Sequence, residues 1–445
     1  MSDKKNLDVS AGQIPKWRAT DTAWMLSLYG TAIGAGVLFL PINAGAGGLL
    51  PLLVMLVLAF PMTFFAHRAL CRFVLSGKNS DGDITVVVEE AFGRTAGNWI
   101  TVLYFFAIYP ILLVYSVGIT NTVIDFMQYQ LSMTAPPRVL LSFILVGALM
   151  LIVHLGENLI IKVMSVLVFP FIVVLMILGL FLIPEWNGAL FTDFSWSGST
   201  LAGSQGIWMT LWLVIPVMVF AFNHSPIISS LAVAKRKEYG EQNVEAKCSR
   251  IIAASNVMMV VTVMFFVFSC ALCLTPAELL DAKAQNISIL SYLSKRFNSP
   301  VIEYMGPIIA FVAMAKSFLG HYLGGKEGFN GIVNKALRSK GKTIGLKKLD
   351  NIAAIFMFVT AWGVATLNPS ILGLIESLGG PVLAIILFLM PMYAIHKLPV
   401  LAKYRGRLSN TFIVVMGLIA ISAAVYLVSG SIYAAIYSLQ ERLGL

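Results

Sequence analysis

The chain has 445 residues, of which 58% are hydrophobic and only 12% are charged. Soluble domains carry about 25% charged residues, so a soluble core cannot hide this apolar surface and much of it must face lipid. The net charge of +10 comes from basic residues between the apolar segments, which indicates membrane topology and argues against a nucleic-acid partner. The four cysteines form no disulfide or metal-binding pattern, and we expect neither a metal nor a cofactor.

Apolar segments of roughly 20 residues are long enough to cross a bilayer as helices. The sequence predicts eleven such spans after a polar N-terminal tail over 1–18, which we expect to be cytoplasmic and without a cleaved signal peptide. The spans cover 21–44, 47–71, 98–124, 137–155, 159–183, 207–232, 250–274, 301–325, 350–367, 379–396 and 410–430. The remaining segment, 431–445, is compatible with an interfacial helix or with an extension of the last span.

The basic residues are distributed unevenly between the two sides of these spans. If the N-terminus lies in the cytoplasm, most of the 31 Lys and Arg residues fall on the cytoplasmic side. The opposite side then holds only Arg138, Lys283, Lys295, Arg296 and Arg442. Because Lys and Arg are enriched in cytoplasmic loops, this asymmetry predicts both the orientation and the number of spans.

The first ten spans divide into two groups of five, 19–184 and 207–397, separated by an outer loop over 185–206 without Lys or Arg. Five is odd, so the second group enters the membrane from the opposite side, as in inverted repeats. Residues 398–445 then hold the eleventh helix and the C-terminal tail. The two groups share no evident sequence repeat, so the division depends on topology and on the positions of helix breaks. We expect the basic segment 326–349 to be a cytoplasmic loop.

Three glycines, Gly30, Gly34 and Gly36, interrupt the first span. They disfavour a continuous helix, and unpaired backbone at this depth is costly unless a ligand satisfies it. The half-helix that restarts near Gly36 presents free N–H groups and the positive end of its dipole, which suit a substrate carboxylate. The predicted contacts are Thr31, Ala32, Gly34, Ala35 and Gly36.

The sixth span is interrupted between Phe222 and Pro226. Proline cannot donate to the helix ladder, so an upstream carbonyl is freed and can bind an ammonium group. The predicted contacts are Phe220, Ala221, Asn223, His224 and Ser225. Both breaks lie near the middle of the bilayer at about 1.5 Å per residue, and together they suit a zwitterion. The alternative is that Gly and Pro merely allow close helix packing.

Lys316 lies roughly 13 Å inside the eighth span, on a helical face with small and polar residues. An intramembrane charge indicates function, and a buried lysine can exchange a proton, so Lys316, Ser317 and His321 are candidates for proton coupling. The alternative role of Lys316 is to cap carbonyls of a broken helix. A fixed cation there argues against a nearby sodium ion.

Three further polar residues lie outside these segments. Tyr115, in the third span, either packs or gates the substrate with its hydroxyl. His67 is expected to be interfacial, at the cytoplasmic end of the second span. Glu376 is placed in a short connection, so no Asp or Glu is predicted in the middle of any span.

Several stretches carry a family resemblance. They are WR at 17–18 with DT at 21–22, GTAIGAGVLFLP at 30–41, NHSPIISS at 223–230, KSFLGHYLG at 316–324, NPSIL at 368–372 and LMPMY at 389–393. The chain resembles the hydroxy and aromatic amino acid permeases of the amino acid–polyamine–organocation superfamily over about 15–430, most of all their serine-transporting branch. The resemblance implies an all-α leucine-transporter-type fold and proton-coupled uptake of L-serine across the bacterial inner membrane, with substrate contacts from both breaks.

We therefore expect a secondary active transporter that imports L-serine with protons by alternating access and is embedded in membrane lipid. Thr31, Asn223, His224 and Ser225 are the candidates for reading the serine hydroxyl. Alternatives are a threonine/serine or aromatic amino acid carrier of the same fold, sodium-coupled or exchange transport, and a receptor-like sensor. An enzyme is not expected, because no nucleophile–base or metal-ligand set is evident. The sequence makes no prediction of the oligomeric state.

Overall fold

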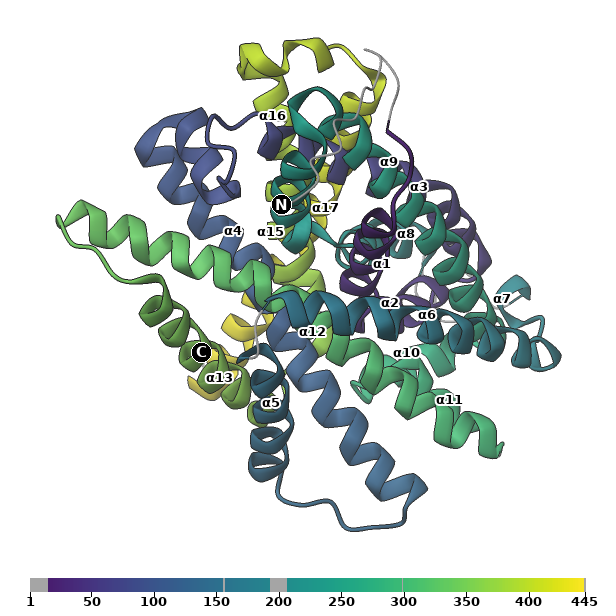
Figure 1. Ribbon diagram of the computed structural model, residues 1–445. Helices are drawn as coiled ribbons and strands as arrows, with labels where there is room; N and C mark the ends of the chain where they lie inside the picture. The colour runs from purple at the N-terminus through teal and green to yellow at the C-terminus, as the bar shows by residue number, and fades with distance from the viewer. Residues whose placement is uncertain (1–14, 155–156, 193–205, 298, 444–445) are drawn as a thin grey trace.

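The computed structural model describes residues 15–154, 157–192, 206–297 and 299–443, and these residues form helices and connections without a β-strand. The first half contains α1 (Ala19–Ala32), α2 (Ala35–Gly45), α3 (Leu49–Leu75), α4 (Ile84–Asp125), η1 (Phe126–Gln130), α5 (Arg138–His154), α6 (Glu157–Phe181), η2 (Ile183–Glu185) and α7 (Ala189–Thr192). Figure 1 shows these helices packed with those of the second half into one bundle, rather than as two separate domains.

The second half begins with α8 (Ile207–Ala221), η3 (Ser225–Ile227) and α9 (Ile228–Leu272). It continues with α10 (Pro276–Ala284), α11 (Ile289–Arg296), α12 (Pro300–Ser339), α13 (Leu346–Leu367), α14 (Ile371–Leu374), η4 (Ile375–Gly379), α15 (Gly380–Ala384), η5 (Ile385–Leu389) and α16 (Met390–Lys397). The short η6 (Pro399–Tyr404) and the long α17 (Leu408–Leu443) complete the described chain.

A helix lies at each of the eleven predicted spans. The first span is the pair α1 and α2, which meet at an angle of 53°. The range of α9 holds two helices, the end of the sixth span and the seventh span, which meet at a kink at Gly240. The φ of 70° at this position suits glycine. Eight helices of the described residues are long and apolar enough to cross a membrane, or nine with the bent pair.

The connections are more helical than the sequence suggests. α12 continues to Ser339, so the prediction of a loop over 326–349 is wrong for its first part. The extension is stabilised because Lys335 and Arg338 pair with Glu89 of α4, while Gly328 lets α12 approach the backbone of Phe105. α17 runs unbroken to Leu443, so the chain from residue 431 to Leu443 continues the helix of the last span.

The centre of the bundle is formed by the broken helices. α2 packs on α8, and α1 packs on α6, α9 and α12. α12 crosses the middle of the molecule in Figure 1 and lies against α4 over much of its length. Between Ser317 and Gly325, α12 is buried on every side, not only on its small and polar face. The two breaks are thus enclosed by α4 and α12.

Candidate functional site

The first break consists of Ile33 and Gly34 between α1 and α2. The first backbone hydrogen bond of α2 is donated by Leu38 to the Gly34 carbonyl, at 3.3 Å. The N–H groups of residues 34–37 therefore precede the helical ladder and converge at the positive end of the α2 dipole. The predicted contacts Thr31, Ala32, Gly34, Ala35 and Gly36 are all buried at this point.

The second break separates α8 from α9. In a continuous helix the Ser225 N–H would bond to the Ala221 carbonyl, but it donates instead to Asn223 Oδ1, at 3.0 Å. The Asn223 N–H likewise donates to the Phe220 carbonyl, three residues back, at 3.2 Å. The carbonyls of Val219 and Ala221 thereby lose the N–H partners that a continuous helix would give them, which creates acceptors next to the free N–H groups of α2.

Glycines bring the two breaks into contact. A Cβ atom on Gly36 would lie 2.6 Å from Ala221 Cα and from Phe220 Cδ1, so only glycine allows α2 this close to the end of α8. A Cβ atom on Gly34 would lie 2.7 Å from Ser317 Cβ and from Tyr115 Cε1. The structure thus joins predicted residues of four helices, α2, α4, α8 and α12, around the breaks.

Polar side chains of α12 bind both breaks. The Ser317 hydroxyl donates to the Thr31 carbonyl, at 2.6 Å. His321 Nδ1 lies 2.9 Å from the Ser317 carbonyl and Nε2 lies 3.3 Å from Asn223 Nδ2, so the ring is neutral, donating from Nδ1 and accepting at Nε2. Tyr115 packs edge-on against His321, with ring centroids 5.2 Å apart.

Lys316 points elsewhere. Its ammonium group lies 4.0 Å from the centroid of the Phe171 ring in α6 and 5.7 Å from that of Tyr29 in α1. The side chain is buried, and its Nζ atom has no hydrogen-bond partner among the residues that the structure describes. Lys316 is therefore beside α1 and α6, whereas its neighbour Ser317 faces the break.

Sequence reasoning missed His67, which is 1% exposed rather than interfacial. Its ring stacks on that of His224, with centroids 3.5 Å apart, and its Nε2 accepts the His224 backbone N–H at 3.1 Å. His224 is thus turned toward α3, while Asn223 is turned toward α12. The Ser225 hydroxyl has no hydrogen-bond partner within the described ranges. A histidine in an apolar helix was the available signal, since such residues face the interior of a bundle.

Glu376 also differs from its prediction. It lies in η4, within the tenth span of Ile371–Lys397, and is 5% exposed. Its carboxylate binds Lys283 of α10 at 3.0 Å and accepts from the Asn43 amide at the end of α2. We name Asn43, Lys283 and Glu376 the α2-end cluster. The sequence signal was a carboxylate flanked by the apolar residues ILGLI and SLGG.

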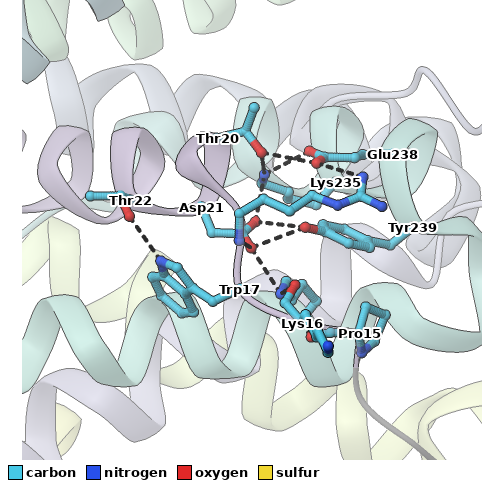
Figure 2. A network of polar contacts seen from close by, with 11 residues as sticks. Pro15, Lys16, Trp17, Thr20, Asp21, Thr22, Lys235, Glu238 and Tyr239 are labelled. Atoms are coloured by element: carbon cyan, nitrogen blue, oxygen red, sulfur yellow. Dashed lines mark hydrogen bonds and ion pairs between the residues drawn. The ribbon is translucent and has the colours of Figure 1, made fainter.

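A second polar cluster holds the beginning of α1 (Figure 2). The buried Asp21 carboxylate lies 2.8 Å from Lys235 Nζ and 2.8 Å from Lys247 Nζ, and accepts the Tyr239 hydroxyl. Lys247 also donates to the carbonyls of Pro15 and Lys16, at 3.0 and 2.8 Å. We name Asp21, Lys235, Tyr239 and Lys247 the α1-start cluster. It ties α1 to both parts of α9.

A cavity of about 1060 Å³ opens beside this cluster, between α1, α4, α9 and α12. Trp24 of α1, Ser229 of α9 and Leu323 of α12 are among its lining residues. Leu323 precedes Gly324, whose close contact is Pro226 in the second break. The cavity therefore extends from the side of the α1 start toward the breaks.

The model of the tryptophan/tyrosine permease family matches residues 22–429. The chain belongs to this family. It is 68% identical to serine transporter SdaC of Escherichia coli (strain K12), over 92% of this chain and 95% of the relative. It is 49% identical to threonine/serine transporter TdcC of Escherichia fergusonii, over 96% and 99%. The resemblance inferred from the sequence motifs is therefore confirmed.

Solved structures show the same fold at low sequence identity. MhsT in complex with L-phenylalanine matches 93% of this chain and 99% of that chain, with a TM-score of 0.51 and 15% identity. Mhp1, a nucleobase-cation-symport-1 family transporter in a closed conformation, matches 95% and 96%, with a TM-score of 0.50 and 12% identity. These matches confirm the expected fold class, an all-α membrane protein with a leucine-transporter-type fold.

Proposed function

We propose that this chain is a secondary active transporter that imports L-serine with protons across the bacterial inner membrane by alternating access. The observation that carries the proposal is the contact of two helix breaks with opposite polarity, N–H groups at the start of α2 and released carbonyls at the end of α8. The names of the relatives at 68% and 49% identity, a serine and a threonine/serine transporter, supply the substrate class.

The carboxylate of serine would bind the N–H groups near Gly34 and Gly36, and its ammonium group would bind carbonyls near Phe220 and Ala221. Among the candidates for the serine hydroxyl, Asn223 and Ser225 are preferred, since both lie in the second break and the Ser225 hydroxyl has no partner in the described part of the chain. The Thr31 hydroxyl instead donates to the Ser27 carbonyl, and His224 is turned toward α3. A site that hydrogen-bonds a hydroxyl rejects alanine strongly, because alanine leaves the partner unpaired. Tyr115 would close over the bound substrate from α4.

Lys316 is the proposed proton-coupling residue, assisted by Ser317 and His321. Its ammonium group has aromatic neighbours and no carboxylate partner in the described part of the chain. A buried amine of this kind is able to exchange its proton when a neighbouring helix moves. The basic residues then orient the N-terminus toward the cytoplasm, and the boundaries 19–184 and 207–397 mark the proposed repeats.

The test is amino acid uptake by the purified chain in proteoliposomes. We expect an imposed inward proton gradient to drive accumulation of labelled L-serine, and excess unlabelled serine to compete far better than alanine. A sodium gradient without a proton gradient is the control. Accumulation driven by sodium alone would contradict proton coupling, and stronger competition by threonine or an aromatic amino acid would reassign the substrate.

A further inference from the structure

The stacked histidine pair lies beside the second break but is not needed to explain the substrate contacts. His67 comes from the second half of α3 and His224 from the unwound segment after α8. Their rings are nearly parallel, at an angle of 10°, and both side chains are essentially unexposed. The pair therefore connects α3 directly to the segment whose conformation shapes the site.

The hydrogen bonds fix the protonation of His67. Its Nδ1 atom lies 2.8 Å from the Thr63 carbonyl, which can only accept, so Nδ1 carries a hydrogen. Its Nε2 atom lies 3.1 Å from the His224 backbone N–H, which can only donate, so Nε2 carries none. His67 is thus neutral with both nitrogen atoms satisfied.

The His224 N–H is a group that the break leaves without a helical partner. A continuous helix would pair it with the Phe220 carbonyl, but that carbonyl already accepts the Asn223 N–H. A buried N–H without an acceptor is costly, particularly at membrane depth. His67 Nε2 provides the acceptor from another helix, and it does so only while it is unprotonated.

The titratable side chains of the helices packed on α3 mostly lie near residues other than His67. The other elements packed on α3 direct their titratable groups to other residues: Glu245, Tyr404 and Arg407 lie near Arg68 and Arg72, and Cys248 faces Cys71. α2 and α8 contain no charged residue. The titratable group that faces His67 is His224 itself.

We propose that His67 is a positioning residue for the substrate site, whose unprotonated Nε2 atom holds the His224 backbone in the conformation that releases the carbonyls of α8. His67 contacts the backbone of the break and not the substrate. The link to transport rests on the proposed function, whereas the hydrogen bond to the His224 N–H can be tested without any substrate.

Two substitutions separate the acceptor from the shape of the ring. His67→Gln keeps an amide oxygen near the position of Nε2 and cannot titrate, whereas His67→Phe keeps the stacked ring and has no acceptor. His396→Gln, at an exposed histidine of α16, is the matched control. His67→Met replaces the Phe variant if that protein does not reach the membrane folded.

The first measurement is hydrogen–deuterium exchange of the full chain, read at the His224 amide. We expect wild-type protection in His67→Gln and His396→Gln, and loss of protection in His67→Phe, with the first break unchanged. Equal protection in the Gln and Phe variants overturns the proposal, whether or not the protein transports serine.

The second measurement is serine uptake by the same proteins. We expect the KM of His67→Phe to rise about tenfold, from the loss of one buried hydrogen bond, while Vmax per folded transporter stays within about twofold of wild type. His67→Gln should restore the wild-type KM. An unchanged KM in the Phe variant, with wild-type serine uptake intact, overturns the positioning role alone. Absence of serine uptake by the wild-type chain overturns the proposed function, and the exchange result still decides the role of His67.

Discussion

The Lys316 amine lies against aromatic rings in a region where the described residues offer no counter-charge. Burying an unpaired ammonium group is expensive, and an ionisable residue inside a membrane span is a candidate functional residue, which supports the proposed coupling role. The cation–π contacts offset only about 2 kcal/mol of this cost. The charge therefore depends on the positions of α1 and α6, which bring Tyr29 and Phe171 to the ammonium group.

We expect Lys316→Gln to retain serine binding but to lose accumulation against a concentration gradient, since an amide cannot carry a proton. Binding is measured by equilibrium dialysis and accumulation by uptake under an imposed proton gradient. Lys348→Gln, which removes an exposed lysine at the start of α13, should behave as wild type. Proton-driven accumulation at the wild-type level in Lys316→Gln would refute the coupling role.

Some residues of the central region were predictable and others were not. Gly34, Gly36 and Pro226 disturb a helix by their own backbone chemistry, so they mark the breaks without reference to the rest of the chain. The environment of His67 depends on His224, far away in the sequence, and that of Glu376 depends on Lys283. No local pattern encodes these partners, so both residues were assigned to the wrong surroundings.

The break between α1 and α2 depends on the close approach of the start of α2 to the end of α8. The Gly36 site has no room for a Cβ atom, because the nearest atoms include the backbone of Ala221, which cannot rotate away. An added methyl group must push the end of α8 from the start of α2. The distance between N–H groups and carbonyls in the proposed site is therefore set by a glycine.

We expect Gly36→Ala to raise the KM for serine at least about tenfold, corresponding to a loss of about 1.4 kcal/mol of binding free energy. Gly363→Ala is the matched control, because Gly363 lies within α13 and has open space around its Cβ position. Alanine there should leave the KM unchanged and favour the helix by up to about 1 kcal/mol. An unchanged KM in Gly36→Ala would remove the carboxylate from this break.

The elements themselves were predictable where apolar length decides, and less so at their ends. Hydropathy located a helix at every expected span because the bilayer demands about 20 apolar residues. It placed the end of α12 too early, because the basic residues after Gly325 resemble a loop until Lys335 and Arg338 meet Glu89. The helix pairing, not the local composition, extends this element.

Across the whole molecule, polar clusters hold the broken helix at both ends. The α1-start cluster binds Asp21 to Lys235 and Lys247, and the α2-end cluster binds Asn43 to Glu376. The breaks lie between them along the chain. The odd number of spans in each half predicts inverted repeats, but these clusters join segments from both halves and follow only from the packed structure. If transport proceeds by alternating access, the clusters must open in turn.

We expect Asp21→Asn to open the side of the bundle at the start of α1. The substitution leaves Lys235 and Lys247 without the carboxylate they share, and breaking a buried ion pair in this way costs about 3–5 kcal/mol. A cysteine placed at Ala234, which lines the cavity beside α1, should then react several-fold faster with a soluble thiol reagent, and serine uptake should fall because this side no longer closes. Arg18→Gln is the control, since it removes the ion pair between Arg18 and Glu238. The Arg18 side chain is 37% exposed, and exposed pairs contribute only about 0–1 kcal/mol. Equal labelling rates in the Asp21→Asn and Arg18→Gln proteins would show that the α1-start cluster does not control access to the cavity.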